Sequence, residues 1–111
     1  DVWKLSMELS KITYRVTAKY PGEEKFGLVS QMRRAAISIP SNIAEGAARS
    51  STNELQYFLS IARGSLSELD TQFDLSRLLG FISETTRSDV DIVLDRVDKM
   101  LYALRRKLKK P

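Results

Sequence analysis

The chain contains no cysteine and no histidine among its 111 residues. It therefore has no disulfide, no thiolate nucleophile, no imidazole general base and none of the usual zinc ligand sets. A Glu-x-x-His metal pattern and a Gly-rich phosphate loop are also absent from the sequence. We expect a protein that is not an enzyme and that needs no metal and no cofactor.

Long apolar runs are missing as well. No run approaches the roughly 18 residues that span a bilayer, and no signal peptide is visible. These absences, together with the lack of cysteine, predict a cytoplasmic protein with no membrane partner. Only three prolines and five glycines occur, and no segment alternates as a strand does. The composition and length predict one all-α domain over residues 1–111.

Apolar residues recur at three- and four-residue steps in four segments, which predicts helices at about 2–19, 24–48, 52–80 and 85–109. Because the connections are short, we expect an antiparallel up-down-up-down four-helix bundle. The apolar seams that would form its core are Val2, Leu5, Leu9, Ile12 and Val16; Leu28, Met32, Ala35, Ile39, Ile43 and Ala47; Leu55, Leu59, Ala62, Leu66, Leu69 and Phe73; and Val90, Val93, Val97, Leu101, Leu104 and Leu108.

Pro40 lies inside the second apolar seam. A proline there removes an amide donor, frees the carbonyl of Ala36 and favours a kink. One alternative is two separate helices, because Ile39 precedes the proline and is pushed away from helical geometry. The apolar period keeps its phase across Pro40, so we expect one helix that is kinked at this residue.

The predicted helices carry more apolar surface than one bundle buries. A second stripe lies opposite the seam of the first helix, and another flanks the seam of the third helix. These residues are either aromatics lying partly exposed under a loop or an interface with another copy of the chain. We favour a homo-oligomer. The interface candidates are Trp3, Met7, Tyr14, Tyr57, Ile61, Gly64, Leu75 and Leu79.

Gly64 is one of these candidates for a different reason. Glycine inside a helix costs about 1 kcal/mol relative to alanine, so close approach of two backbones would explain it. A tolerated surface glycine is the alternative.

Several polar residues occupy positions that need an explanation. Glu68 lies on the second apolar side of its helix, where a desolvated carboxylate requires a partner. The second helix carries a polar row, and its Arg34 offers a bidentate guanidinium. We hypothesise an Arg34–Glu68 pair, either between the two helices or across a subunit boundary; the alternative is that these side chains face water. The structural polar candidates are Arg34, Ser38, Asn42, Glu45 and Glu68.

The formal charge of +4 is unevenly distributed. Five cations lie within residues 105–110, so the remaining chain is close to neutral, and a further row of cations follows the first helix. Both groups predict nucleic-acid binding, mainly through phosphates. The alternative for the C-terminal group is a solvated helix end, where cations suit the helix dipole. The nucleic-acid candidates are Lys4, Lys11, Arg15, Lys19, Arg105, Arg106, Lys107, Lys109 and Lys110.

Two segments, QMRRAAISIPSNIAEGAAR and FLSIARGSLSELDT, resemble a bacterial four-helix-bundle family encoded in intervening sequences of 23S ribosomal RNA genes. Members of that family are often called ribosomal proteins. The accessory variability-determinant protein of diversity-generating retroelements is a relative. The family's recurrent motif positions correspond to Arg34, Ala35, Ser38, Ile39, Pro40, Asn42, Ile43, Ala44, Glu45 and Gly46, and to Ala62, Arg63, Gly64, Ser65, Glu68 and Leu69.

This resemblance implies a homopentamer, a barrel of five bundles around a central channel. In the retroelement relatives, the basic outer surface of the barrel binds nucleic acid and a reverse transcriptase. The implied partners are therefore further copies of the chain, RNA or DNA, and a reverse transcriptase or other neighbouring gene product. The resulting prediction is a non-enzymatic pentameric accessory protein that binds nucleic acid. The alternative is a protein–protein interaction scaffold that binds no nucleic acid.

Overall fold

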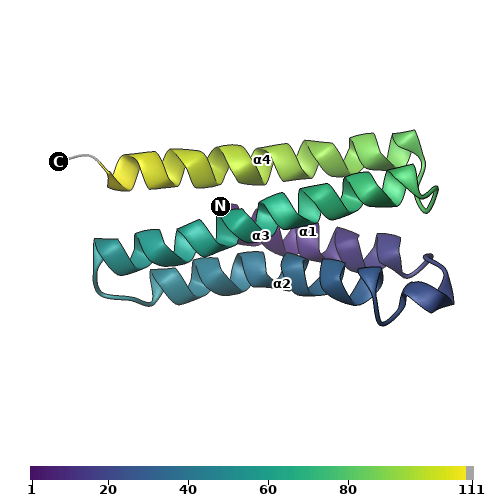
Figure 1. Ribbon diagram of the computed structural model, residues 1–111. Coiled ribbons are helices and arrows are strands. Elements are labelled where there is room, and N and C mark those ends of the chain that lie inside the picture. The colour runs from purple at the N-terminus through teal and green to yellow at the C-terminus, as the bar shows by residue number, and fades with distance from the viewer. Residues whose placement is uncertain (110–111) are drawn as a thin grey trace.

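The computed structural model describes residues 1–109, which form four α-helices and one short 3₁₀-helix (Figure 1). The elements are α1 (Val2–Thr17), η1 (Gly22–Glu24), α2 (Leu28–Ala47), α3 (Thr52–Leu78) and α4 (Glu84–Leu108). Consecutive helices run antiparallel, and α1 and α4 also contact each other, which closes the bundle. No strand occurs in the described part of the chain. The predicted all-α, up-down-up-down four-helix bundle is confirmed.

The four helices differ in length, and this shapes one end of the bundle. α1 has 16 residues, whereas α3 has 27 and α4 has 25. Figure 1 shows that α1 begins well short of the end where α4 finishes. At that end the last turns of α4 lie beside the first turns of α3, with no α1 next to them.

The core confirms the predicted seams. Apolar residues from all four helices form one buried cluster, and the outer seam positions of α1 and α4 pack against it. Ala47 is the exception because it is exposed, and Gly46 is buried instead. A Cβ at Gly46 would lie 3.0 Å from both Leu55 Cδ1 and Phe58 Cβ. Glycine therefore allows the end of α2 to approach α3 closely.

The start of α2 differs from the expected residue 24. Residues 24–27 are not part of this helix, because η1 ends at Glu24 and Gly27 has the non-helical angles φ −113° and ψ −108°. Phe26 is 90 % exposed, so this turn buries little apolar surface. The helix begins where Leu28 and Val29 start to pack on the core. The other helix ends lie within two residues of the expected positions.

α2 continues through Pro40 as a single helix, so the alternative of two helices is wrong. The carbonyl of Ala36 loses the amide of residue 40 as its helical partner. The hydroxyl of Ser10 on α1 donates to this carbonyl at 2.8 Å. A hydrogen bond between helices therefore replaces the one that the proline removes.

Ser10 belongs to a stripe of hydroxyl residues on α1 that the apolar period did not reveal. Ser6, Thr13 and Thr17 are buried, and their hydroxyls donate to carbonyls one turn earlier in α1. Small side chains that satisfy their own hydroxyls in this way can be buried without another partner. The Arg33 Nε of α2 also donates to Thr17 Oγ1, at 3.0 Å.

Candidate nucleic-acid interface

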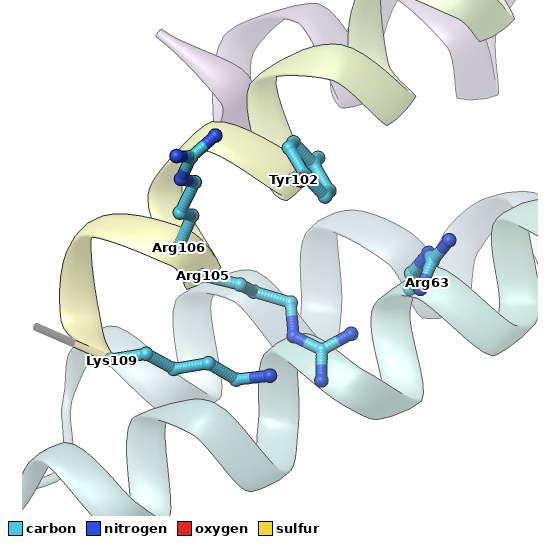
Figure 2. A pocket seen from close by; sticks show the side chains of 5 residues that line it. All are labelled: Arg63, Tyr102, Arg105, Arg106 and Lys109. Carbon is cyan, nitrogen blue, oxygen red and sulfur yellow. The ribbon is translucent and has the colours of Figure 1, made fainter.

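A basic hollow of about 250 Å³ lies between the end of α4 and the first half of α3. Three of its lining residues are on α4, one is the C-cap residue that follows α4, and one is on α3 (Figure 2). They are Arg63, Tyr102, Arg105, Arg106 and Lys109. We call this site the cationic hollow.

Helix geometry places the α4 residues on one face. Tyr102, Arg105, Arg106 and Lys109 follow steps of three, four and seven residues, which bring side chains to the same side of a helix. Figure 2 shows Arg105 and Lys109 extending from α4 toward α3, while Arg106 points away from them and stands at the rim. Arg63 rises from α3 on the opposite wall.

Gln56 of α3 holds the end of α4 in place. Its amide Nε2 donates to the carbonyl oxygen of Arg105 at 2.9 Å, and its Oε1 accepts from Arg105 Nε at 3.4 Å. The first contact satisfies one of the carbonyls that a helix C-terminus leaves without an amide partner. The second orients the Arg105 guanidinium, so this cation is positioned before any ligand arrives.

The charge of the cationic hollow is largely uncompensated. Within residues 1–109, Asp98 is the only carboxylate paired with one of its cations. Its Oδ1 lies 3.9 Å from Arg63 Nε, and both side chains are about half exposed. Among residues 1–109, Arg105, Arg106 and Lys109 form no ion pair. The arrangement suits an anionic ligand that offers several charges close together.

The structure brings together only part of the predicted cation set. Lys4 is exposed beside Arg96 in a separate hollow between α1 and α4. Lys11 and Arg15 are exposed on α1, which runs toward the opposite end of the bundle, and Lys19 is exposed in the turn after this helix.

On α4, the exposed Lys107 lies about 140° around the helix from Tyr102, at 100° per residue. Lys110 lies outside the described residues. The predicted cations therefore do not form one continuous patch.

Two residues of the cationic hollow were not among the predicted site residues. Tyr102 precedes Arg105 and Arg106 by three and four positions, so helical spacing could have placed this aromatic beside the cations. Arg63 joins them only through the register of α3 against α4, which a single sequence does not specify.

Most predicted interface residues are exposed in the single subunit. Trp3, Met7, Tyr14, Tyr57, Leu75 and Leu79 are exposed, and Ile61 is half-buried. Trp3 and Met7 also line an apolar groove of about 380 Å³ between α1 and α2, whose floor includes Ile37, Pro40 and Ala44. We call this feature the α1–α2 groove. The structure describes a single subunit, so the oligomer stays a prediction.

Gly64 does not bring two backbones together within the subunit. A Cβ built at this position meets no atom within 4 Å. Gly64 therefore has no role in packing between the helices of one chain, and the predicted close approach at a subunit interface stays a prediction. Gly46, not Gly64, is the glycine that intrachain packing requires.

The polar row of α2 makes contacts other than the predicted ion pair. Arg34 and Glu68 line one polar hollow of about 390 Å³, but no ion pair joins them in the described chain, and both are exposed. The pair between two helices of one subunit is therefore wrong. Glu68 faces water in the single subunit, so no partner is required there. The pair across a subunit boundary stays a prediction.

The remaining members of this row form a local network. Asn42 Nδ2 donates to the carbonyl and the hydroxyl oxygen of Ser38, at 2.8 and 2.9 Å. The Ser65 hydroxyl of α3 donates to Ser38 Oγ at 2.8 Å. Glu45 pairs with Arg49 one turn later. Ser38 and Ser65 thus connect α2 to α3, which gives these residues a structural role.

Two further kinds of site are not found in residues 1–109. No helix there combines the length and the hydropathy of a membrane span. No group of three or more carboxylates is arranged to hold a metal ion in that range.

The comparisons with known proteins identify the family. The model of the family described as 23S rRNA-intervening sequence protein matches residues 1–103. A crystal structure of a protein of unknown function from the S23 ribosomal protein family of Bacteroides thetaiotaomicron shares the fold, with a TM-score of 0.85 and 20 % sequence identity. The alignment covers 99 % of this chain and 100 % of that chain. No curated protein matches the sequence. From the family match over residues 1–103, the chain belongs to the 23S rRNA-intervening sequence protein family.

Proposed function

We propose that this protein is a non-enzymatic accessory protein that assembles from identical subunits and binds nucleic acid through phosphate contacts. The observation that carries the binding proposal is the cationic hollow, where Arg105, Arg106 and Lys109 have no carboxylate partner among residues 1–109. A pentamer is the assembly that the resemblance to the retroelement relatives implies.

The geometry favours phosphates over base edges. Arginine forks match phosphate oxygens, and lysine adds a mobile point charge. The cationic hollow lies at one end of the bundle, and in the described part of the chain no isolated helix or β-ribbon projects that could enter a major groove. Binding should therefore depend weakly on sequence and strongly on salt concentration.

The α1–α2 groove supports the assembly proposal. Its lining is almost entirely apolar, and it includes Trp3 and Met7 at 41 % and 46 % exposure. Contiguous exposed apolar surface of this kind typically marks an interface. Assembly would place several cationic hollows on one particle, and a nucleic acid that reached two of them would bind much more tightly than at one.

The binding proposal is tested by titrating labelled RNA and DNA at about 50 and 200 mM salt, a range over which phosphate binding weakens steeply. The wild type should bind at low salt and lose most of its affinity at high salt. The variant Arg105→Gln/Arg106→Gln/Lys109→Gln should bind at least tenfold more weakly and with a shallower salt dependence. Lys25→Gln, an exposed cation next to η1, is the matched control and should bind as the wild type does.

Two results would overturn the binding proposal. One is the absence of binding at low salt, and the other is unchanged affinity in the triple variant. A stable oligomer that ignores nucleic acid would favour the protein–protein scaffold instead.

The assembly proposal is tested by light scattering. The wild type should form a particle well above the 12.6 kDa of one subunit. Met7→Lys and Ile37→Lys place charge in the α1–α2 groove and should shift the particle toward single subunits. Ile92→Lys changes an exposed apolar residue of α4 that does not line this groove, and it should leave assembly intact. A wild type that remains a single subunit at all concentrations would contradict the proposal.

A further inference from the structure

We propose that the cationic hollow holds an unpaired nucleotide of a single strand, with its base stacked on Tyr102 and its flanking phosphates on Arg105 and Lys109. This inference rests on the proposed nucleic-acid binding and specifies its substrate as single-stranded. It concerns a site that lies partly beyond the residues of the family match, which ends at residue 103.

The first argument is that the Tyr102 ring is exposed and has no aromatic or cation–π partner within residues 1–109. Tyr102 is 58 % exposed although it is a large aromatic residue in a packed bundle. Within residues 1–109, the aromatic pairs are Tyr20–Phe81 and Tyr57–Phe58, and the cation–π contacts involve Phe26, Tyr14 and Phe58. Tyr102 takes part in none of them. An aromatic side chain without an intramolecular partner is available for stacking on a base.

The second argument is that cations from both sides of the cationic hollow line it together with this ring. Arg105 and Arg106 follow Tyr102 by about one helical turn, and Lys109 follows by about two turns, a length of about 10 Å along α4. Arg63 faces them from α3 (Figure 2). An aromatic platform within a positively charged groove is the combination that binds single strands without sequence preference.

The third argument excludes an intact duplex at this subsite. In a duplex each base stacks on its neighbours, so its face is not available to Tyr102 unless the base leaves the helix. Extruding a base costs a few kcal/mol of stacking and pairing energy. Stacking on Tyr102, which lines the cationic hollow, contributes about 1–3 kcal/mol, and in a duplex the extrusion cost would consume most of that gain. A single strand meets no such cost.

The rigidity of the site adds to the argument. Gln56 orients the Arg105 guanidinium and anchors the carbonyl of the same residue. The cation that would meet the phosphate is thus held at a set position relative to Tyr102, which lies on the same helix. Positioning before binding lowers the entropic cost of capture.

The test compares a labelled oligothymidine single strand with a duplex of equal length by fluorescence anisotropy at one low salt concentration. The wild type should bind the single strand at least tenfold more tightly than the duplex. Tyr102→Ala should lose about tenfold in single-strand affinity and leave the duplex affinity unchanged, since stacking contributes only to the former. Tyr102→Phe keeps the ring and should retain single-strand affinity.

Phe26→Ala is the matched aromatic control because Phe26 is highly exposed between η1 and α2, and the start of α2 lies at the opposite end of the bundle from the end of α4 (Figure 1). Circular dichroism of each variant establishes that the helices remain folded. Equal binding of single strand and duplex, with no effect of Tyr102→Ala, would overturn this inference and leave the proposed function standing. Absence of binding to either probe would overturn both. A further contradicting result is that polyglutamate displaces the nucleic acid completely and Tyr102→Ala has no effect. The ligand would then be an acidic polypeptide, and the single-strand inference would be overturned.

Discussion

The two ends of the α3–α4 pair use arginine in opposite ways. Near the start of α4, the side chain of Arg87 is only 11 % exposed and is paired with Asp70 and Asp74 of α3 and with Asp91 of α4. At the other end, Arg105 and Lys109 have no carboxylate partner within residues 1–109. The residue type is the same at both ends, and the surroundings differ.

This comparison distinguishes cations that are paired within the chain from cations that are free to bind a ligand. The guanidinium of Arg87 is largely compensated by acids of the same chain, so its attraction for an external anion is weak. The cations of the cationic hollow are not compensated in this way, so their positive potential can attract an anionic ligand. Whether a cation stabilises the bundle or can bind an anion depends on its ion pairs within the chain, more than on residue type or net charge.

The largest effect that tests this comparison is expected from Arg87→Met. Removing the buried guanidinium leaves three nearby carboxylates that repel one another, and the free energy of unfolding should fall by about 2 kcal/mol. Urea unfolding measures this change. Arg106→Met in the cationic hollow should change the free energy of unfolding by less than about 0.5 kcal/mol, as surface substitutions do. Equal effects at the two ends would break the comparison.

The next largest effect on stability is expected at the Ala36 carbonyl, which accepts a hydrogen bond from the Ser10 hydroxyl. Ser10→Ala removes the hydroxyl that donates to it, and the free energy of unfolding should fall by about 1 kcal/mol. In a Pro40→Ala background, the amide of residue 40 can bond this carbonyl, so Ser10→Ala should then cost clearly less. A double-mutant cycle by thermal unfolding measures the difference, and additive effects would show that Ser10 does not compensate for the proline.

A smaller effect is expected from the one acid that is paired with the cationic hollow. Asp98 lies 3.9 Å from Arg63, and both side chains are half exposed. Exposed pairs of this kind contribute about 0.2–1 kcal/mol, so Asp98→Asn should raise nucleic-acid affinity about threefold with little change in stability. Asp95→Asn, which alters an exposed acid with no ion pair in the described chain, is the control. An affinity that is lower or unchanged in Asp98→Asn would contradict the electrostatic description of the site.

The smallest effect on stability at neutral pH is expected from removing the Tyr20 hydroxyl, which is buried without a hydrogen-bond partner in the described chain. The Tyr20 hydroxyl makes no hydrogen bond within residues 1–109, where the Ser76 hydroxyl donates to the Gln72 carbonyl oxygen. Burial raises the pKa of Tyr20 above its usual value of 10.0. Tyr20→Phe should therefore change the free energy of unfolding by less than about 0.5 kcal/mol at pH 7.

The sign of the pH dependence follows from that raised pKa. Below pH 10 the hydroxyl is protonated in both the folded and the unfolded chain, so its contribution is constant. Above pH 10 the unfolded chain loses the proton first, and the stability of the wild type falls. Tyr20→Phe lacks this loss and should become the more stable protein as pH rises through this range. Parallel pH profiles for the two proteins would contradict this assignment.

The seams of the bundle could be predicted because burial follows the helical period. Leu9 and Val97, for example, are fully buried where the 3-4 spacing placed them. The start of α2 could not be predicted in this way, because the turn before Leu28 is not packed on the core, as the high exposure of Phe26 shows. Periodicity shows which side of a helix is apolar, and it does not show where neighbouring elements end.

The candidate site depended on information that the sequence carries only in part. The cations of α4 and their common face follow from spacing alone. Their meeting with Arg63 depends on the register of α3 against α4, which contacts such as Gln56 to the carbonyl of Arg105 establish. Glu68 was placed on an apolar side, yet it faces water, because the flank of α3 that it shares is not covered within one subunit.

The most direct test of the central claim maps where nucleic acid touches the protein. A single strand containing 5-bromouracil is irradiated in complex with the protein, and the cross-linked peptide is identified by mass spectrometry. We predict a cross-link at Tyr102, in a peptide of α4, which disappears when Arg105, Arg106 and Lys109 are replaced by glutamine. Cross-links confined to α1, or none at all at low salt, would contradict the account.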